Sequence, residues 1–369
     1  MRLLDRYLLR ELLVPLGYCL CGFLIFYVAF DLMFQITRFL ENNMRFLDIV
    51  EYYVVLLPEL LVEQVLPVSL LLALLYTLTN LSRYNELTAI RAAGIGLWRL
   101  SMPYIIVGAV FGLVALIISE FWLPGASDQE KYILGRRLPN ATQRNWVYKL
   151  EFYNETDHRD WNIGGFNKNT SEMIHPKVQW PPGPGSNETI VASKAVYGDG
   201  QWSFYNAEVW LQYGRGIPFV QSSNAVLRES FQETPSWINS EIKVNMLNPA
   251  DAAKGQGTQL SIRQIIDYLR LHPITEKKAM LLTQLNGRLA APFTCLAVVL
   301  IALPFGARAG RQNVFVGVAS SIFICFGYFI LQRISFGLGV GGYLPPFLAA
   351  WLPNMICGAV GLSLLAQMR

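Results

Sequence analysis

The sequence predicts a membrane protein with six spanning helices and one β domain, of sandwich or open jelly-roll type, inserted between the third and fourth helices. Of its 369 residues, 53% are hydrophobic and only 15% are charged, which is too apolar for an ordinary soluble protein. The apolar residues form long runs in both end regions of the chain. Residues 124–285 are polar and contain short segments rich in aromatic and β-branched residues.

Each long apolar run is near the roughly 20 residues needed to cross a bilayer. The expected spans are residues 12–34, 54–81, 103–123, 289–305, 314–331 and 346–366. Pro58 and Pro67 should bend the second span. Arginines gather before the first span, between the second and third, between the fourth and fifth, and after the sixth. This asymmetry predicts that both termini are cytoplasmic and that the polar middle faces outward.

The short polar stretch between the second and third spans has helical content. Asn85 or Ser82 could cap a helix near residues 82–95, and Gly94 could end it in the left-handed conformation. Glu86 in the first turn would interact favourably with the helix dipole and face water. Two interpretations are open: a cytoplasmic helix resting on the headgroups, or a docking helix that offers one acid and a small apolar face to a partner.

The polar middle contains four expected strands, at residues 148–153, 190–197, 202–210 and 219–228. Gly164-Gly165, residues 181–185 and residues 198–200 are expected turns. Strands at such spacing favour a sandwich or an open jelly roll over a βαβ domain. Residues 261–272 and 276–289 are expected to be helical and to lead back into the membrane.

Several kinds of chemistry have no motif in this sequence. It contains no G-x-x-x-x-G-K-[ST] phosphate loop, no H-E-x-x-H and no G-x-S-x-G. Its three histidines lack metal-ligand spacing, and all five cysteines lie in apolar runs, so we expect no catalytic residue, metal, cofactor or disulfide framework. The small formal charge of +4 gives no case for nucleic-acid binding.

Acidic residues inside the spans are candidate functional groups. Glu59 and Glu63 are four residues apart, hence on one helix face, and Asp31 lies near the outward end of the first span. A charge exposed to lipid costs about 2.5–3.5 kcal/mol, so these acids should face a cavity, an internal partner or the membrane interface. Gly108 and Gly112 form a small-xxx-small pair that indicates close helix packing.

Several stretches resemble the lipopolysaccharide-export permeases LptF/LptG (also called YjgP/YjgQ). The most diagnostic is NELTAIRAAG, within LPELLVEQVLPVSLLLALLYTLTNLSRYNELTAIRAAGIGLWRL. SEFWLPGASDQ, VASKAVYGDGQWSFYNAEVW, RLAAPFTCLAVVLIALPFGARAGRQ and GGYLPPFLAAWLPN match as well. The resemblance covers essentially the whole chain.

The resemblance implies a bacterial inner-membrane protein with helices 1–3 in residues 1–123, a periplasmic β jelly roll in residues 124–285 and helices 4–6 in residues 286–369. It also implies a homologous permease partner, a cytoplasmic LptB-like ATPase dimer and a periplasmic LptC/LptA-like β-bridge protein. ATP and Mg would be used by that ATPase, and the substrate would be a glycolipid. A different class of function, a membrane-anchored interaction protein without transport, is the alternative, and co-purification of an ATPase would separate the two.

The resemblance also implies site residues. The loop after the second span matches a coupling helix that docks on the ATPase, with docking residues Arg83, Glu86, Leu87, Ala89, Arg91 and Gly94. Arg38 fits a lipid-phosphate contact and Arg45 lies at the same membrane edge, whereas Asp31 departs from the family pattern because an acid repels phosphate. The candidate substrate residues are Asp31, Arg38, Arg45, Glu59, Glu63, Trp202, Phe204 and Trp210. The last three belong to a predicted apolar slot in the β domain.

Overall fold

The computed structural model describes residues 3–136, 146–183, 185–213, 219–223, 227–245, 260–308 and 314–367. The chain forms two compact units. The first, here called the membrane unit, comprises Met1–Arg136, Pro249–Ile262 and Ala279–Arg369. The second, the β unit, comprises Arg137–Asn248 and Arg263–Lys278. The expected division at residues 124 and 285 differs slightly, because the helix that follows the third span packs with the membrane unit.

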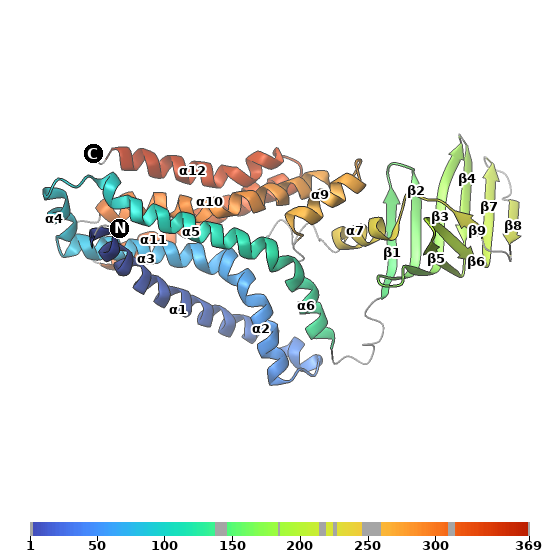
Figure 1. Ribbon diagram of the computed structural model, residues 1–369, viewed down its shortest axis with the longest axis horizontal. Helices are drawn as coiled ribbons and strands as arrows, with labels where there is room; N and C mark the ends of the chain where they lie inside the picture. The colour runs from blue at the N-terminus through green and yellow to red at the C-terminus, as the bar shows by residue number, and fades with distance from the viewer. Residues whose placement is uncertain are drawn as a thin grey trace. The chain divides into compact units, whose positions relative to one another are not determined.

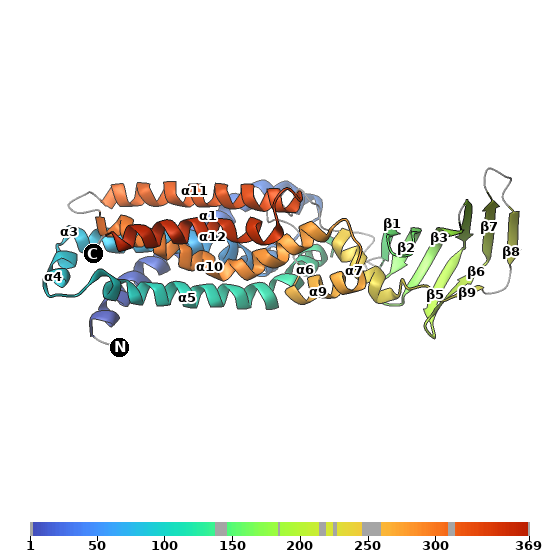
Figure 2. The same cartoon turned by 90° about the horizontal axis from the view of Figure 1, so that it is seen from above.

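The membrane unit is helical. Its elements are α1 (Leu3–Glu41), α2 (Phe46–Leu60), the π-helix η1 (Leu61–Val65), α3 (Leu66–Arg83), α4 (Glu86–Ala92), α5 (Leu97–Phe121), α6 (Leu123–Gly135), α10 (Lys278–Arg308), α11 (Val314–Val340) and α12 (Pro346–Ala366). Six helices in the described part of the chain are long and apolar enough to cross a membrane, as predicted: α1, α3, α5, α10, α11 and α12. In both views the first turns of α1, the end of α12 and α4 lie at one end of the bundle (Figures 1 and 2).

The second predicted span is interrupted. Residues 54–81 run through the end of α2, the π-helix and most of α3, and only Leu66–Arg83 is long and apolar enough to count as the span. The π-helix lies between Pro58 and Pro67, the two residues expected to bend this segment. Proline removes a backbone donor, so the prolines account for an irregular helix here.

Leucines at every fourth position join α1 to α3. Leu8, Leu12 and Leu16 are at most 2% exposed, and they belong to the same buried cluster as Leu70 and Leu74 of α3. A spacing of four residues places side chains on one face of a helix. The Thr77 hydroxyl of α3 also donates a 2.9 Å hydrogen bond to the backbone carbonyl of Glu11.

Glycines allow α5 and α12 to approach α10 closely. A Cβ atom at Gly112 would overlap the backbone carbonyl of Pro292, and one at Gly108 would lie 2.9 Å from a methyl carbon of Val299. A Cβ atom at Gly361 would lie 2.5 Å from the backbone carbonyl of Leu300. The expected close packing at Gly108 and Gly112 is therefore present, and its partner is α10.

The described residues of the β unit form an antiparallel sheet of nine strands, together with the helices α7 (Pro235–Asn245) and α9 (Ile262–Leu271). The strands are β1 (Trp146–Asn154), β2 (Arg159–Asn167), β3 (Glu172–Gly183), β4 (Ser186–Val191), β5 (Lys194–Gly198), β6 (Gln201–Tyr205), β7 (Ala207–Tyr213), β8 (Phe219–Ser223) and β9 (Leu227–Glu229). The order is β8-β7-β4-β3-β5-β6-β9, with β2 also paired to β3 and β1 to β2 (Figure 1). The prediction missed β2 and β3, and it placed a turn at Gly164-Gly165, which lie inside β2. Close neighbours explain both glycines, since a Cβ atom at Gly165 would lie 3.3 Å from the rings of Trp146 and Tyr148, and one at Gly164 would lie 3.0 Å from the backbone carbonyl oxygen of Ile174.

The predicted strand at residues 148–153 lies within β1, whereas each of the three later predicted strands covers parts of two observed strands. The breaks fall at Ala192-Ser193 between β4 and β5 and at Asn206 between β6 and β7, and β8 ends at Ser223 before β9 begins at Leu227. His175 of β3 and Asn206 both have positive φ, at 46° and 51°. The Ser193 carbonyl accepts a 3.0 Å bond from the His175 amide, and the Ser193 amide donates to Tyr205 over 3.2 Å. We call the line defined by His175, Ser193 and Asn206 the crease. Along it β3 takes a positive φ, and the strand pairs β4/β5 and β6/β7 are interrupted.

Candidate functional site

The first candidate is the connection from α3 to α5, which the arginine pattern predicts to be cytoplasmic. Its α3 helix ends at Arg83, Asn85 adopts a left-handed conformation at φ 60°, and Gly94 does the same at φ 80° after α4. Asn85 is the N-cap, but its side chain makes no capping hydrogen bond. The break at Tyr84-Asn85 separates α4 from α3, so the helix expected near residues 82–95 covers only Glu86–Ala92, and Ser82 still belongs to α3.

One side of α4 is anchored to the bundle. Leu87 is 5% exposed and belongs to the buried leucine cluster, so it holds the helix in place rather than facing outward. Glu86 accepts a 2.7 Å hydrogen bond from the Tyr7 hydroxyl of α1. Arg99 at the start of α5 bonds both carboxylate oxygens of Asp5 at 3.0 Å. Two polar contacts to the first turns of α1 thus fix the ends of this connection.

The opposite side of α4 is open and small. The exposed residues of α4 are Thr88, Ala89, Arg91 and Ala92, and Arg83, Ala93 and Gly94 are exposed beside it. A face made mainly of alanine, glycine and threonine allows a partner's side chains to come close to the backbone. Of the six predicted docking residues, five are exposed or half-exposed, and Leu87 is buried.

In the second half of α1 and at the start of α2, the predicted substrate residues Asp31, Arg38 and Arg45 have different surroundings. Asp31 accepts a 3.0 Å hydrogen bond from the Tyr53 hydroxyl of α2, so its charge has a partner within the membrane unit. Arg38 and Arg45 are exposed, and among the residues that the structure describes neither makes an ion pair. The carboxylate of Asp31 is thus bonded to Tyr53 and not to Arg38, and the positive charge of Arg38 remains at the surface.

The paired acids of the second span lie in different kinds of helix, since Glu59 is near the end of α2 and Glu63 is within the π-helix η1. Glu59 is half-buried in α2 and interacts with other parts of the structure. The side chain of Glu63 lies outside the described residues. A π-turn changes the angle between residues four apart, so the argument from a shared α-helical face does not hold for this pair.

In the β unit the three candidate aromatics do not face the same way. Trp202 and Phe204 are fully buried in one aromatic and aliphatic cluster, whereas Trp210 is 38% exposed. The crease explains the difference: alternation restarts after Asn206, so Trp202, Phe204, Ala207 and Val209 point inward. Trp210 then falls on the outer face of the sheet.

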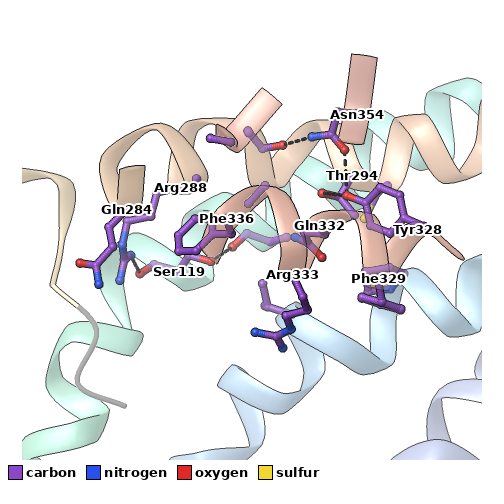
Figure 3. A pocket seen from close by; sticks show the side chains of 18 of the residues that line it. Ser119, Gln284, Arg288, Thr294, Tyr328, Phe329, Gln332, Arg333, Phe336 and Asn354 are labelled. Atoms are coloured by element: carbon purple, nitrogen blue, oxygen red, sulfur yellow. Dashed lines mark hydrogen bonds between the residues drawn. The ribbon is translucent and has the colours of Figure 1, made fainter. Parts of the chain in front are cut away.

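The membrane unit also contains a cavity of about 180 Å³ that the sequence prediction missed. Figure 3 shows its polar lining, where Tyr328 of α11 bonds Asn354 of α12 at 2.8 Å and Thr294 of α10 at 3.0 Å. Arg288 donates to the Ser119 carbonyl of α5 over 2.8 Å, and Arg333 also lines the cavity. The signal that could have revealed it is the presence of the polar residues Thr294, Tyr328 and Asn354 inside the fourth, fifth and sixth predicted spans.

Metal chemistry finds no support in the described parts of the chain. No group of three or more histidine, cysteine, aspartate or glutamate side chains is placed to hold a metal ion among those residues. The five cysteines are free thiols.

These features define a class of protein: a multi-pass membrane protein with a β-sheet unit in the middle of its chain. The chain belongs to the family of lipopolysaccharide export system permeases LptF/LptG, whose model matches residues 6–367, essentially its whole length. A search of curated proteins found no match. The family consists of transport components, so this chain is a permease-type subunit and not an enzyme.

Proposed function

We propose that this chain is the permease subunit of an ATP-driven transporter of the bacterial inner membrane. It extracts lipopolysaccharide or a similar glycolipid from that membrane and passes it to a β-bridge protein in the periplasm. The observation that carries the proposal is the match to the LptF/LptG family over residues 6–367. Both termini and α4 would lie in the cytoplasm, and the β unit in the periplasm.

The small exposed face of α4 supports docking of a separate ATPase dimer of the LptB type. That ATPase binds ATP and Mg, and the chain itself binds no cofactor. Glu86, half-exposed at the start of α4, is the acid that pairs with a basic residue of the ATPase, and Ala89, Arg91 and Gly94 form the surface around it. The Tyr7–Glu86 contact joins α1 to α4, and the Asp5–Arg99 contact joins α1 to α5. Both would transmit movement of the docked helix to α1.

Two spanning helices are poorly covered, which supports a homologous permease subunit as partner. Of the apolar membrane-crossing stretch of α1, only 11% of the residues are buried, and of that of α11 only 17%. The corresponding stretch of α3 is 72% buried. The outer face of α1 carries large side chains such as Phe26, Phe30 and Phe34, all more than half exposed. A second subunit against α1 and α11 would cover these faces and enclose a lipid between them.

The ends of the sheet support handover to a bridge of LptC/LptA type. Within the described strands, β1 pairs only with β2, and β8 and β9 each have a single neighbour. Unpaired strand edges can continue a sheet into a partner by main-chain hydrogen bonds. The glycolipid's acyl chains would travel along the inward face of the same sheet.

Purification of the full chain in mild detergent, followed by mass spectrometry of associated proteins and lipids, tests this function. A small ATPase, a second six-span homologue and a phosphorylated glycolipid are the expected companions. A membrane-anchored interaction protein without transport would give a periplasmic partner and no nucleotide-driven subunit. Purification with no ATPase in several detergents would contradict the transporter assignment.

A further inference from the structure

The interior of the β unit contains a segment of the chain that belongs to no strand and no helix. β9 ends at Glu229 and α7 (Pro235–Asn245) begins six residues later. Between them the side chains alternate: Ser230 and Gln232 are exposed, and Phe231 and Glu233 are buried. The main-chain hydrogen bonds of this segment are local: the Thr234 amide donates to the Gln232 carbonyl over 2.9 Å, and the Thr234 carbonyl accepts from the Ile238 amide of α7 over 3.0 Å.

Phe231 occupies the centre of the aromatic cluster. Its ring centroid lies 5.6 Å from that of Trp161, 5.5 Å from that of Trp180 and 6.2 Å from that of Phe204. These three rings come from β2, β3 and β6, so one side chain holds strands from different parts of the sheet together. Without Phe231 the aromatic cluster would enclose an apolar space lined by rings.

Glu233 fixes the segment in place through polar contacts. Its side chain is fully buried, and it accepts hydrogen bonds from Arg159 at 2.5 Å and from Asn154 at 2.7 Å. The Glu233 carbonyl accepts a 2.7 Å bond from the indole of Trp202. Asp157 holds the other side of the Arg159 guanidinium at 3.0 Å, and that guanidinium lies 4.6 Å from the Phe231 ring centroid.

A buried carboxylate is a costly way to fill a core. Replacing buried ion pairs by apolar residues often leaves stability unchanged or raises it, and a switch between two arrangements is one attested use of such a pair. The attachment on one side is also short, since β9 pairs with β6 over three residues only. The segment therefore has an apolar side chain in the core, a buried ion pair between Glu233 and Arg159, and a short strand, β9, before it.

We propose that residues 230–233 are a removable plug that occupies an acyl-chain site, with Phe231 filling the place of the chain and the Glu233–Arg159 pair acting as the latch. This inference rests on the proposed function, in which a lipid passes through the β unit. Opening the latch frees the rings of Trp161, Trp180 and Phe204 to contact an acyl chain. Closing it keeps that surface from water when no lipid is present.

The test uses the full chain with its co-purifying partners in vesicles of phosphatidylethanolamine and phosphatidylglycerol that contain purified lipopolysaccharide. A photo-crosslinking amino acid replaces Val209, which packs on the aromatic cluster. Glu233→Gln weakens the latch, so the yield of crosslinked lipid at limiting lipid should rise about tenfold, since a hydrogen bond to a charged group contributes that much or more to an equilibrium. Phe231→Ala and the milder Phe231→Leu should raise it as well.

The matched control is Ile163→Ala, which removes apolar volume from the same cluster but lies outside the plug. It should not raise the yield, and protease resistance of the β unit shows that each variant is folded. If folded Glu233→Gln and Phe231→Leu behave like Ile163→Ala, the segment is an ordinary part of the core and the proposal is wrong. Separate vesicles with labelled lipopolysaccharide or labelled phosphatidylethanolamine identify which lipid supplies the chain.

A second crosslinking position separates failure of the plug from failure of the proposed function. Phe34 is 66% exposed on α1 and reports lipid at the membrane unit without reference to residues 230–233. Lipid captured at Phe34, with no gain at Val209 in the plug variants, overturns the plug alone. No lipid at either position overturns the proposed function and the plug together.

Discussion

At the scale of single residues, Glu86 is an acid with one partner inside the chain and an open face beside it. Glu86→Arg should abolish co-purification of the ATPase while the permease still inserts, because a reversed charge at a buried contact costs about 2–5 kcal/mol. Pull-down of the ATPase from detergent extracts measures this. Tyr7→Phe is the control, since it removes the 2.7 Å internal bond and leaves the acid. Equal loss in both variants would mean that the position of α4, rather than the charge, matters.

Arg38 and Arg45 make a residue-scale prediction about the lipid. Both are exposed and are predicted to lie at the membrane edge, where a guanidinium can bind a phosphate with two hydrogen bonds. An Arg38→Glu, Arg45→Glu double variant should slow glycolipid release from proteoliposomes by about tenfold or more, since charge-assisted bonds contribute about 1.5–3 kcal/mol. The double lysine variant should keep most of the rate. Release at the normal rate from the glutamate variant would exclude the contact.

The surroundings of His272 predict that the β unit loses stability in acid. Burial lowers the pKa of His272, which stacks on Tyr268 and lies 3.3 Å from Glu241 and near Lys277. The folded state resists protonation, so stability is retained above the ordinary histidine pKa of about 6.5 and falls as pH drops below it. Unfolding followed by tryptophan fluorescence should show a lower melting temperature at about pH 5.5 than at about pH 7.5. A His272→Gln variant should lose that difference, and an unchanged pH dependence would contradict the assignment.

At the scale of elements, the contact of α5 with α10 depends on a missing side chain. Gly112→Val should force the helices apart, because its Cβ would overlap the Pro292 carbonyl, at a cost of about 1–3 kcal/mol or more. Gly125→Val in α6 is the matched control, since nothing lies within 4 Å of a Cβ atom there. Thermal unfolding in detergent should separate the two variants. Equal melting temperatures would show that the two helices are not held this closely.

The elements also show which structure can be read from sequence. The six spans were predictable because a long apolar run is a local signal. The left-handed conformation of Gly94 was predictable because a glycine just after a short helix commonly adopts it. Strand β2 was not, because Gly164-Gly165 has the composition of a turn and only the rings packed on it reveal a strand. Tyr7–Glu86, Tyr53–Asp31 and Arg159–Glu233 join residues 22 to 79 positions apart, and no spacing rule connects them.

At the scale of the whole molecule, the arginine asymmetry predicts that α4 and the β unit lie on opposite sides of the membrane. Thr88 and Asn169 are both exposed, and cysteines at these positions, in a chain without its five native cysteines, should be labelled from opposite sides by an impermeant reagent. The measurement compares intact cells with permeabilised ones. Labelling of both cysteines in intact cells would require a different number of crossings.

The crease in the β unit affects the interpretation of crosslinking probes placed at successive positions along β6 and β7. Inward positions are even-numbered before Asn206, at Trp202 and Phe204, and odd-numbered after it, at Ala207 and Val209. A lipid moving along this inner surface would therefore meet a pattern with a phase jump of one residue. Probes placed at every second position from Ser203 onward would report contact only beyond the crease, and a lipid that follows the whole strand would look as if it entered halfway.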